Sequence, residues 1–525
     1  MLSCLFVNKI PPPGDLGLNI NSWRSGQEDF IINSLISPKR VKVGCAGTGY
    51  GKSYVAVGIA LLSKIPTCIV TESRGLQSQY MSDFKSVGMV DLRGRKNYQC
   101  EFKDEFTCED GFAARCPYKG TVSCPASQAE MRAATSSLVV TNYAKWTASK
   151  KYGNGMSHFK QVIFDEGDCV PQALADALQI TLHHREINEK LKIQFPDEND
   201  AEEFTNWRPW AAAARVISEA EMITALARIT GISDPRPSWV RHYNHMKNLT
   251  RRLSLLSTAS PKDWIVDKTN EGYQFDPIRP GKYGESHILF RIPSVIFMSA
   301  TIRPKTIYMC GISKENFEFR EYDSDFDPAR GPIYYVPTVR VDSRADSLGL
   351  LWLLLDQIAS RRRDRRAIVQ TTSYAYQRAV MASSRFSESM LLNPQGEPPT
   401  EMIEQFLQSQ LGTILVSPSV GRGYNFADDA CRWQFICKIP FDPPSKILKA
   451  REEADKEYRP YRAIQKLTQN FGRHVRSKTD WGESFIGDKH CDWFLPRYGH
   501  LAPRDFHKRL KTVTVVPKPP RLEDM

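Results

Sequence analysis

Short apolar runs that end in polar, glycine-rich or acidic turns recur along the chain, and stretches with a helical pattern alternate with them. One set of runs lies at 41–53, 67–73, 137–143, 161–168 and 294–302, and a second set at 332–337, 366–374, 412–420 and 432–441. Short runs rich in Val and Ile that alternate with helices are typical of parallel sheets covered on both faces. The pattern therefore predicts an α/β fold with two parallel-sheet domains.

Two stretches interrupt the first set of runs. Residues 100–135 contain four cysteines, and residues 172–270 have almost no strand pattern but are rich in Ala, Glu, Arg and Leu. The second stretch is therefore predicted to be helical. The predicted boundaries are a first parallel-sheet domain at 1–99, 136–171 and 271–322, a cysteine-rich insert at 100–135, a helical insert at 172–270, and a second parallel-sheet domain at 323–525.

Two basic segments of the second domain lie outside these runs. Residues 361–366, with the sequence RRRDRR, are interpreted as a solvated helix end. The basic, proline-containing residues from about 503 onward are expected to form a loose tail.

The composition is that of a soluble globular protein with several domains. Of its 525 residues, 41% are hydrophobic and 25% are charged, which argues against global disorder and coiled coil. No run approaches the roughly 20 apolar residues of a membrane-spanning helix. The N-terminus lacks a basic leader and a small-residue cleavage site, so an intracellular protein is expected. The net charge of +12 favours an acidic partner, for which nucleic acid is the usual candidate.

A phosphate-binding loop is predicted between the first apolar run and the helical stretch after it. The sequence fits [AG]xxxxGK[ST], and glycines in such a loop let backbone N–H groups turn toward phosphate oxygens at a helix N-terminus. Lys52 is expected to reach the β and γ phosphates of ATP, and the Ser53 hydroxyl to ligate Mg²⁺. The predicted ATP-binding residues of the loop are Ala46, Gly47, Thr48, Gly49, Tyr50, Gly51, Lys52 and Ser53.

An acidic pair closes the apolar run at 162–164. Asp165 is expected to hold Mg²⁺, directly or through water, and Glu166 to position and polarise the attacking water. An acidic pair at a strand end is often only a solvated turn, but the phosphate loop upstream favours the catalytic interpretation. Both residues are therefore predicted to be catalytic.

A third pattern, QxxGRxxR, places Gln469, Arg473 and Arg476 in one segment. Phosphoryl transfer spreads negative charge over the γ-phosphate oxygens, and arginine is the residue that matches this charge best. Two arginines three residues apart on a helix share one face. All three residues are predicted to act in catalysis, although a solvated basic helix face would show the same spacing.

The four clustered cysteines are Cys100, Cys108, Cys116 and Cys124, each separated from the next by seven residues. Four thiolates suit either a [4Fe–4S] cluster or Zn²⁺. Structural zinc sites usually include a tight knuckle with two to four residues between ligands, and this block has none. Unliganded structural cysteines are the remaining alternative.

The order of these motifs resembles that of superfamily 2 helicases. The shared order begins with Arg24 and Gln27 and continues through the phosphate loop, residues 71–79, Asp165–Glu166, residues 299–301 and QxxGRxxR. The segments LRGRKNYQC, TNYAKW, FMSATI and KIPFDPP are similar to the iron–sulfur helicases of the XPD/DinG group. The resemblance covers about residues 20–500. It implies two RecA-like domains, with an iron–sulfur insert and a helical, arch-like insert in the first.

The resemblance also implies roles for individual residues. In the NYQC context, the four cysteines are expected to hold a [4Fe–4S] cluster rather than zinc. Arg24 and Gln27 are expected to contact ATP, and the Gln27 amide could pair with both N6 and N7 of adenine. The residues expected to couple the nucleotide to DNA are Asp168, Ser299, Ala300, Thr301 and Gly423, and those expected to contact DNA are Arg93, Arg95, Lys96, Asn142 and Tyr143.

Three positions depart from the family pattern. Asp168 replaces the histidine of the usual DEAH box, Asn425 stands where an aspartate is more usual, and Ala46 replaces a common glycine. The two carboxylates of the acidic box remain, so hydrolysis is expected. The substitutions at 168 and 425 put the strength of coupling to DNA in question.

The resulting prediction is an ATP-dependent DNA helicase that moves 5′→3′ on single-stranded DNA, a polarity implied by the resemblance alone. The alternative is a DNA-stimulated ATPase or translocase that remodels protein–DNA complexes without efficient unwinding. The expected cofactors are ATP, Mg²⁺ and a [4Fe–4S] cluster, and the expected partners are single-stranded and forked DNA. A monomer without membrane contact is expected, in the cytoplasm or nucleoid, or in a host cell if the source is viral.

Overall fold

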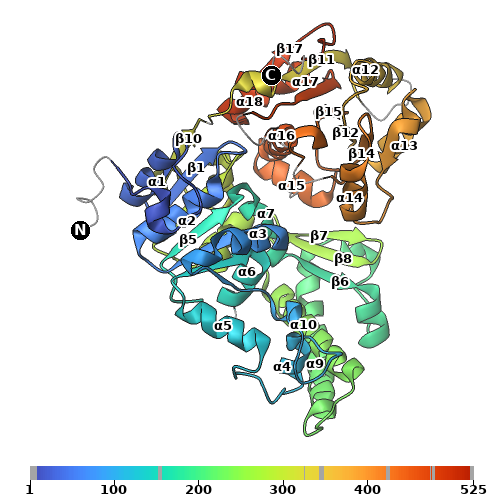
Figure 1. The fold of residues 1–525 in the computed structure, drawn as a ribbon. Helices are drawn as coiled ribbons and strands as arrows, with labels where there is room; N and C mark the ends of the chain where they lie inside the picture. The colour runs from blue at the N-terminus through green and yellow to red at the C-terminus, as the bar shows by residue number, and fades with distance from the viewer. Residues whose placement is uncertain are drawn as a thin grey trace.

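The computed structural model describes residues 9–151, 156–323, 325–341, 348–420, 426–472, 475 and 479–520. Two seven-stranded sheets and one three-stranded sheet form the framework of these residues (Figure 1). Every strand pair within the two large sheets is parallel. The predicted fold class, α/β with two parallel-sheet domains, is confirmed.

The first sheet has the order β10-β1-β9-β5-β2-β4-β3. Its central strands β2 and β5 are buried along their whole length, because helices cover both faces. Its strands are β1 (Val41–Ala46), β2 (Thr67–Thr71), β3 (Val90–Asp91), β4 (Leu138–Asn142), β5 (Gln161–Asp165), β9 (Ser294–Ser299) and β10 (Phe317–Tyr322). The helices of this domain are α1 (Gln27–Ile36), α2 (Lys52–Ser63), α3 (Arg74–Phe84), α6 (Tyr143–Lys151), α7 (Val170–Leu178) and α11 (Pro304–Met309).

The second sheet has the order β13-β14-β12-β15-β16-β11-β17. Its strands are β11 (Ile333–Val339), β12 (Ala367–Gln370), β13 (Met390–Leu392), β14 (Ile414–Ser417), β15 (Trp433–Ile436), β16 (Glu483–Asp488) and β17 (Leu510–Thr512). The helices are α12 (Leu348–Ser360), α13 (Tyr374–Ser383), α14 (Thr400–Gln408), α15 (Lys446–Ala454), α16 (Tyr458–Phe471), α17 (Cys491–Tyr498) and α18 (Arg504–Arg509).

Two inserts extend from the first sheet and pack against each other at the lower end of the molecule (Figure 1). The cysteine-rich insert contains α4 (Cys108–Ala113) and α5 (Pro125–Thr135), between β3 and β4. The other insert contains α8 (Glu198–Ala201) and a long hairpin of α9 (Phe204–Ile229) and α10 (Pro237–Thr258).

The second insert is not purely helical, which corrects the expectation from its sequence pattern. An antiparallel sheet of β6 (Ile180–His183), β7 (Trp264–Thr269) and β8 (Gly272–Pro277) forms its base. The strands have only four or six residues, and β6 lies far in the sequence from its partner β8, whereas β7 and β8 form a hairpin. Their alternation is therefore too brief to stand out beside two long helices.

The basic segments of the second domain are ordered, so the expectation of a loose tail is wrong. The run at 361–366 does follow the end of α12, with Arg361, Arg363 and Asp364 exposed, but Arg362 and Arg365 are buried. Arg362 is fully buried and forms a bidentate ion pair with Glu483, with both N–O distances at 2.7 Å. Arg362 Nη2 also donates to the Pro517 carbonyl at 3.2 Å, and Arg365 Nη2 donates to the Pro520 carbonyl at 2.8 Å. Strand β17 of the tail pairs with β11. Arg362 and Arg365 then hold the chain that follows, as far as residue 520.

Helices α15 and α16 of the second domain contact the first domain and the base of its helical insert. Lys305 Nζ pairs with Asp455 at 2.7 Å, and the Thr306 and Tyr461 hydroxyls lie 2.6 Å apart. Arg451 Nη2 donates to the Pro277 carbonyl at 3.0 Å. These contacts fix the two sheets relative to each other. Within the described ranges, no helix combines the length and apolar character needed to cross a membrane.

Candidate nucleotide-binding and coupling site

The predicted phosphate loop lies between the end of β1 and the start of α2. Strand β1 ends at Ala46 and α2 begins at Lys52, so the loop has the strand–loop–helix context that phosphate binding requires. Gly49 and Gly51 have φ angles of +74° and +81°, which favour glycine. A Cβ on Gly51 would also lie 2.5 Å from Gln27 Nε2. The geometry therefore needs glycine at both positions.

Gln27 and Arg24 hold the phosphate loop from the side of α1. Gln27 Nε2 donates to the carbonyls of Tyr50 at 2.6 Å and Gly51 at 3.4 Å, and its Oε1 accepts from the Arg24 backbone N–H at 2.8 Å. The Arg24 guanidinium donates to the Gly49 carbonyl. In this structure the Gln27 amide fixes the shape of the loop, and its contact with adenine stays a prediction.

Lys52 lies over the mouth of the same loop. Its Nζ donates to the carbonyls of Ala46 and Gly47, both at 3.3 Å. The ammonium group is therefore already held at the loop where phosphate oxygens are predicted to bind.

The acidic pair lies at the end of β5, beside Lys52. Burial raises the pKa of Asp165, while the positive charge of Lys52 and the hydrogen bond from Tyr80 act in the opposite direction. The Tyr80 hydroxyl donates to Asp165 Oδ2 at 2.7 Å. Glu166 has a φ of +51°, a left-handed conformation that is uncommon for a residue with a side chain. Such strain persists only where the surroundings enforce it, and it is concentrated at functional sites.

Asp168 is the centre of a hydrogen-bond network that joins the two domains. Its carboxylate accepts from Ser299 Oγ at 2.6 Å, from Thr301 Oγ1 at 3.1 Å and from Gln469 Nε2 at 2.8 Å. Ser299 Oγ also donates to Glu166 Oε2 at 3.3 Å. A carboxylate accepts several donors at once, whereas a neutral histidine offers a single acceptor nitrogen. The aspartate therefore forms a network that the usual histidine could not form in the same way.

The main chain between Ser299 and Thr301 also contacts β1. The Ala300 carbonyl accepts a hydrogen bond from Cys45 Sγ at 3.5 Å. Residues 299–301 are thus held between the strand that leads into the phosphate loop and the Asp168 carboxylate.

Arg473, Arg476, Gly423 and Asn425 lie outside the described residues, but the chain beside the two arginines does not. A Cβ placed on Gly472 would lie 3.0 Å from Thr48 Cγ2 of the phosphate loop. Gly47 and Thr48 also line a small cavity together with Val475 and Arg509 of the second domain. The end of α16 therefore lies directly against the phosphate loop.

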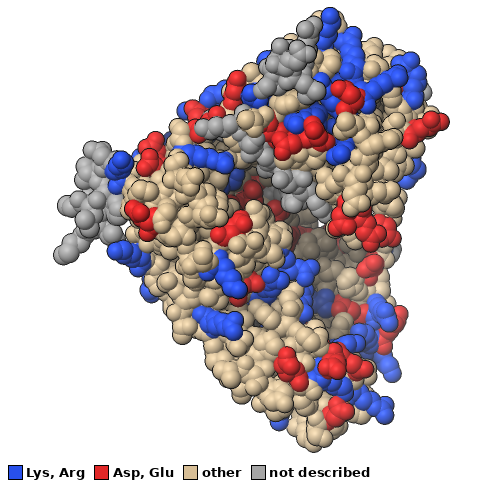
Figure 2. All heavy atoms as spheres, in the orientation of Figure 1, with Lys and Arg blue, Asp and Glu red and all other residues tan. Residues whose placement is uncertain are grey.

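A cleft of about 600 Å³ lies between the lobes, and Asp168 lines it. Figure 2 shows the molecule hollowed between its upper and lower lobes. Arg462 spans the two domains by donating to Gln172 Oε1 at 2.7 Å. Charged and polar residues of both domains line the cleft, among them Glu72, Asp176, Arg462, Gln465 and Lys466.

The four predicted cluster ligands are buried in the cysteine-rich insert as two pairs. The sulfur atoms of Cys100 and Cys116 lie 3.9 Å apart, and those of Cys108 and Cys124 lie 4.0 Å apart. Gly111 packs against the first pair, because a Cβ there would lie 2.5 Å from Cys100 Sγ and 3.4 Å from Cys116 Cβ. Burial raises the pKa of the Cys108 and Cys116 thiols.

This donor set fits the chemistry of an iron–sulfur cluster, which is bound by four thiolates. In the described part of the chain, no group of three or more His, Cys, Asp or Glu residues is arranged to hold a single metal ion. The identity of the bound group stays a prediction.

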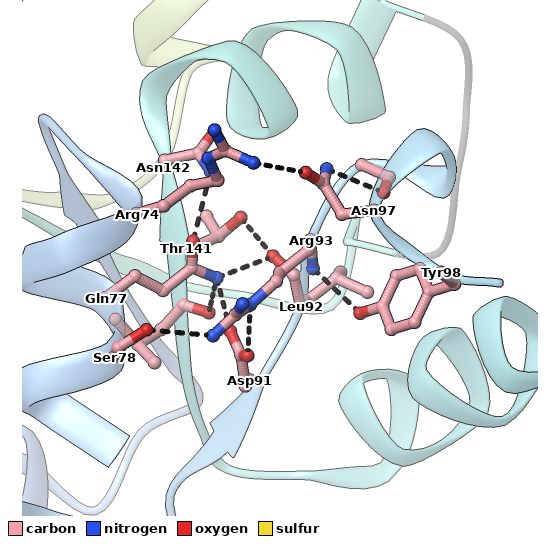
Figure 3. A network of polar contacts seen from close by, with 12 residues as sticks. Arg74, Gln77, Ser78, Asp91, Leu92, Arg93, Asn97, Tyr98, Thr141 and Asn142 are labelled. Carbon is pink, nitrogen blue, oxygen red and sulfur yellow. Dashed lines mark hydrogen bonds and ion pairs between the residues drawn. The ribbon is translucent and has the colours of Figure 1, made fainter. Parts of the chain in front are cut away.

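The predicted DNA contacts Arg93 and Arg95 are paired with acidic side chains (Figure 3 shows Arg93). Arg93 Nε lies 2.7 Å from Asp91 Oδ2, and its Nη2 donates to Ser78 Oγ at 3.1 Å. Arg95 forms a bidentate pair with Glu130, and its guanidinium lies 4.0 Å from the centre of the Phe112 ring. The Arg95–Glu130 pair therefore links the chain that follows β3 to α5 of the cysteine-rich insert, whereas Arg93 contacts β3 and α3 of the first domain.

The other predicted contacts differ in their surroundings. Lys96, the residue after Arg95, is exposed. Asn142 Nδ2 donates to Gln77 Oε1 at 3.0 Å, which ties β4 to α3 (Figure 3). The Tyr143 hydroxyl is buried and donates to the carbonyls of Asp165 and Glu166 at 3.2 and 3.3 Å. Tyr143 thus braces the acidic box from the side of α6.

Tyr80 was not identified from the sequence, although it contacts the acidic box. It follows the segment 71–79 on α3 and reaches Asp165 across 85 positions of sequence. An aromatic residue on a helix next to a sheet is normally a core residue, so only the position of α3 against β5 reveals the contact.

Comparison with known proteins agrees with this geometry. Residues 357–509 match the family described as the helicase C-terminal domain. Across 90% of its length, the chain is 22% identical to an ATP-dependent DNA helicase, YoaA of Haemophilus influenzae, of which 92% is covered.

Two solved structures share the fold. An XPD helicase matches with a TM-score of 0.69 at 14% identity, covering 93% of this chain and 99% of the other. Xpd4 of S. tokodaii matches with a TM-score of 0.59 at 12% identity, covering 93% and 100%. At these identities, the structural matches establish the arrangement of the chain.

Proposed function

Because this chain is an XPD/DinG-like superfamily 2 helicase in sequence and fold, we propose that it uses ATP hydrolysis to move along single-stranded DNA and to unwind duplexes. The observation that carries the proposal is the hydrogen bond from Gln469 to Asp168, at 2.8 Å. It joins the second domain to the acidic box of the first, and Gly472, at the end of the same helix, lies against Thr48 of the phosphate loop. A change at the nucleotide can therefore alter the relative position of the two domains.

The nucleotide is proposed to bind between the phosphate loop and the end of α16. Lys52 would bind the β and γ phosphates, Ser53 and Asp165 would hold Mg²⁺, and Glu166 would orient the attacking water. Bound Mg²⁺ would offset the charge that develops on the phosphate oxygens. The contact between Gly472 and Thr48 supports the roles proposed for Arg473 and Arg476, because the segment that carries them meets the loop.

Coupling to DNA is proposed to run through Asp168, Ser299 and Thr301. The carboxylate accepts hydrogen bonds from both of these residues and from Gln469. Opening of the two domains must break the bond to Gln469 and leave the other two in place. With aspartate in place of the usual histidine, coupling is proposed to be retained through the Asp168 carboxylate and its three hydrogen bonds. Ala300 and Gly423 are proposed to assist this coupling.

DNA is proposed as the substrate because the chain carries a net charge of +12 and resembles a named DNA helicase. Single-stranded and forked DNA are the proposed forms, with 5′→3′ movement of a monomer. Lys96, which is exposed beside the cysteine-rich insert, is the predicted contact best placed to bind a phosphate. Arg93, Arg95, Asn142 and Tyr143 are proposed to support that surface through their internal contacts.

The four buried cysteines are proposed to hold a [4Fe–4S] cluster. Such a group would tie together four points of a small insert that has only a limited core of its own. The side chains of Cys100 and Cys116 already pack with the end of the helical hairpin, so the ligands also fix the junction of the two inserts.

The proposal is tested by ATPase and strand-separation assays with wild type and Lys52→Ala. We expect ATP turnover that single-stranded DNA stimulates and that the substitution abolishes. Forked substrates with a single 5′ or 3′ tail then test polarity, and a 5′ tail is expected to be required. Translocation without strand separation would favour the remodelling alternative. ATP turnover that survives Lys52→Ala would contradict the proposed ATP-driven movement along DNA.

A further inference from the structure

Tyr80 connects two residues that belong to different motifs of the nucleotide site. It lies on α3 and is only 1% exposed. Its hydroxyl donates to Asp165 Oδ2 at 2.7 Å, and the Ser53 side chain lies near enough to act on the phenol electrostatically. Ser53 lies in the first turn of α2 and Asp165 closes β5, so the phenol group lies close to both the start of the helix and the end of the strand.

The direction of the hydrogen bond between Tyr80 and Asp165 follows from the chemistry of the two groups. An ionised carboxylate only accepts, and a phenol has one proton, so that proton is donated to Asp165. The lone pairs of the Tyr80 oxygen then remain available to accept from the nearby Ser53 hydroxyl. A hydrogen bond from Ser53 would complete an ordered chain from Ser53 through Tyr80 to Asp165. It would direct the Ser53 proton toward Tyr80, which leaves the lone pairs of Ser53 Oγ available on its other side.

We propose that Tyr80 is a positioning residue for Mg²⁺, which orients the Ser53 hydroxyl and the Asp165 carboxylate as its ligands. The inference rests on the proposed function, because it assumes that Mg²⁺–nucleotide binds between these two residues. Hydrogen bonds from a residue that is not itself a ligand hold the metal ligands in one orientation and raise the affinity for the metal. Tyr80 itself does not touch the metal or the nucleotide.

The surroundings of Tyr80 keep the phenol protonated. Burial and the nearby Asp165 charge raise the pKa of Tyr80 well above its usual value. The ring also packs against Phe84, with 5.6 Å between ring centres. Phenylalanine would fill the same space in the core as the Tyr80 ring. The core packing therefore does not require the hydroxyl.

The test measures ADP binding by calorimetry with saturating Mg²⁺ and with EDTA. Tyr80→Phe is compared with wild type and with Tyr54→Phe, a matched control in the same core, where Tyr54 packs edge-on against Phe84. In Tyr80→Phe, the tightening of ADP binding by Mg²⁺ is expected to fall about tenfold, as for the loss of one hydrogen bond to a charged group. Metal-free ADP affinity and the control are expected to stay within about twofold of wild type.

A cycle with Ser53→Ala separates positioning from general destabilisation. If Tyr80 acts through Ser53, Tyr80→Phe costs less in the Ser53→Ala background, whereas an effect on overall folding would be additive. Tyr80→Leu removes the hydroxyl in a different shape and must give the same metal-specific loss.

The outcomes distinguish the inference from the function on which it rests. If Mg²⁺ tightens ADP binding to folded Tyr80→Phe as much as to wild type, the role of Tyr80 is overturned and the proposed helicase function is unaffected. Wild type whose ADP binding does not respond to Mg²⁺ contradicts the proposed nucleotide site itself. If circular dichroism shows that neither Tyr80→Phe nor Tyr80→Leu folds, Tyr80 is a structural residue and the inference is overturned.

Discussion

The side-chain amide of Gln469 donates a hydrogen bond to the Asp168 carboxylate, with 2.8 Å between Nε2 and Oδ2. The bond links α16 of the second domain to the acidic box of the first. Ser299 and Thr301 donate to the same carboxylate. The buried Asp168 carboxylate is therefore hydrogen-bonded both to the nucleotide side of the first domain and to a helix of the second domain.

Asp168→Asn is expected to uncouple ATP turnover from DNA. The amide retains one acceptor oxygen but places an NH₂ group among three donors, so at least one hydrogen bond is lost. We expect DNA stimulation of ATPase activity to fall about tenfold, or roughly 1.4 kcal/mol, while DNA-independent turnover changes little. Steady-state ATPase assays with and without single-stranded DNA measure the effect. Asp364→Asn, at an exposed aspartate, is the control. Full stimulation of ATPase activity by DNA in Asp168→Asn would contradict the proposed coupling through Asp168.

Gln27→Ala is expected to weaken ATP binding by releasing the phosphate loop. Gln27 Nε2 holds the Tyr50 carbonyl at 2.6 Å, and this contact is lost without replacement. Loss of one such buried hydrogen bond corresponds to an increase of about fivefold to tenfold in KM for ATP. The KM is measured at saturating DNA, with the exposed Gln79→Ala as the control. An unchanged KM would show that the loop keeps its shape without Gln27.

The two parallel sheets could be predicted because their strands are buried on both faces. Strands such as β2 and β5 form continuous apolar runs, and this pattern survives without any knowledge of the partners. The phosphate loop and acidic pair were equally accessible, because each is a local sequence at the end of one strand. The structure places them beside each other as parallel topology requires.

Contacts between distant segments could not be predicted in the same way. The sequence shows that Asp168 replaces a histidine, but not that it accepts hydrogen bonds from Ser299, Thr301 and Gln469. Tyr80 resembles an ordinary core aromatic until α3 is placed against β5. The arginine run resembled a solvated surface because its partner, Glu483, lies 121 residues away.

Cys108→Ser is expected to remove the bound iron. Serine is a poor ligand for an iron–sulfur cluster, and the insert would lose one of its four proposed attachment points. Iron and acid-labile sulfide are measured in anaerobically purified protein, where wild type is expected to contain about four of each per chain. Cys310→Ala, at a buried cysteine outside the insert, is expected to keep them. Stoichiometric zinc without iron in wild type would contradict the cluster.

Arg362→Ala is expected to destabilise the second domain strongly. Arg362 and Glu483 are both buried, with side chains 0% and 2% exposed, so the substitution leaves a buried carboxylate without its partner. The expected loss is about 3–5 kcal/mol in the free energy of unfolding, measured by urea denaturation. The exposed neighbour Arg363→Ala is expected to lose less than about 0.5 kcal/mol. The double variant Arg362→Met with Glu483→Leu should recover much of the loss, because no charge is left unpaired.

The base of the helical insert is expected to lose stability in acid through Glu186. Burial acts to raise the pKa of Glu186, but the hydrogen bond and charge of Arg252 outweigh it and hold this pKa below the ordinary value of 4.5. Arg252 Nη2 lies 2.5 Å from Glu186 Oε1. For a carboxyl whose pKa is lowered on folding, the stabilisation is present above pH 4.5 and is lost as the pH falls through the lowered pKa.

This pH dependence is measured as the thermal unfolding midpoint between pH 7 and pH 3. Arg252→Gln is expected to lower the midpoint at pH 7 and to flatten its decline below pH 4.5, because Glu186 then loses the charge that holds its pKa low. Arg215→Gln serves as the control, since it breaks only an exposed pair with Glu219 on α9. A decline in Arg252→Gln as steep as that of wild type would assign the acid sensitivity to other groups.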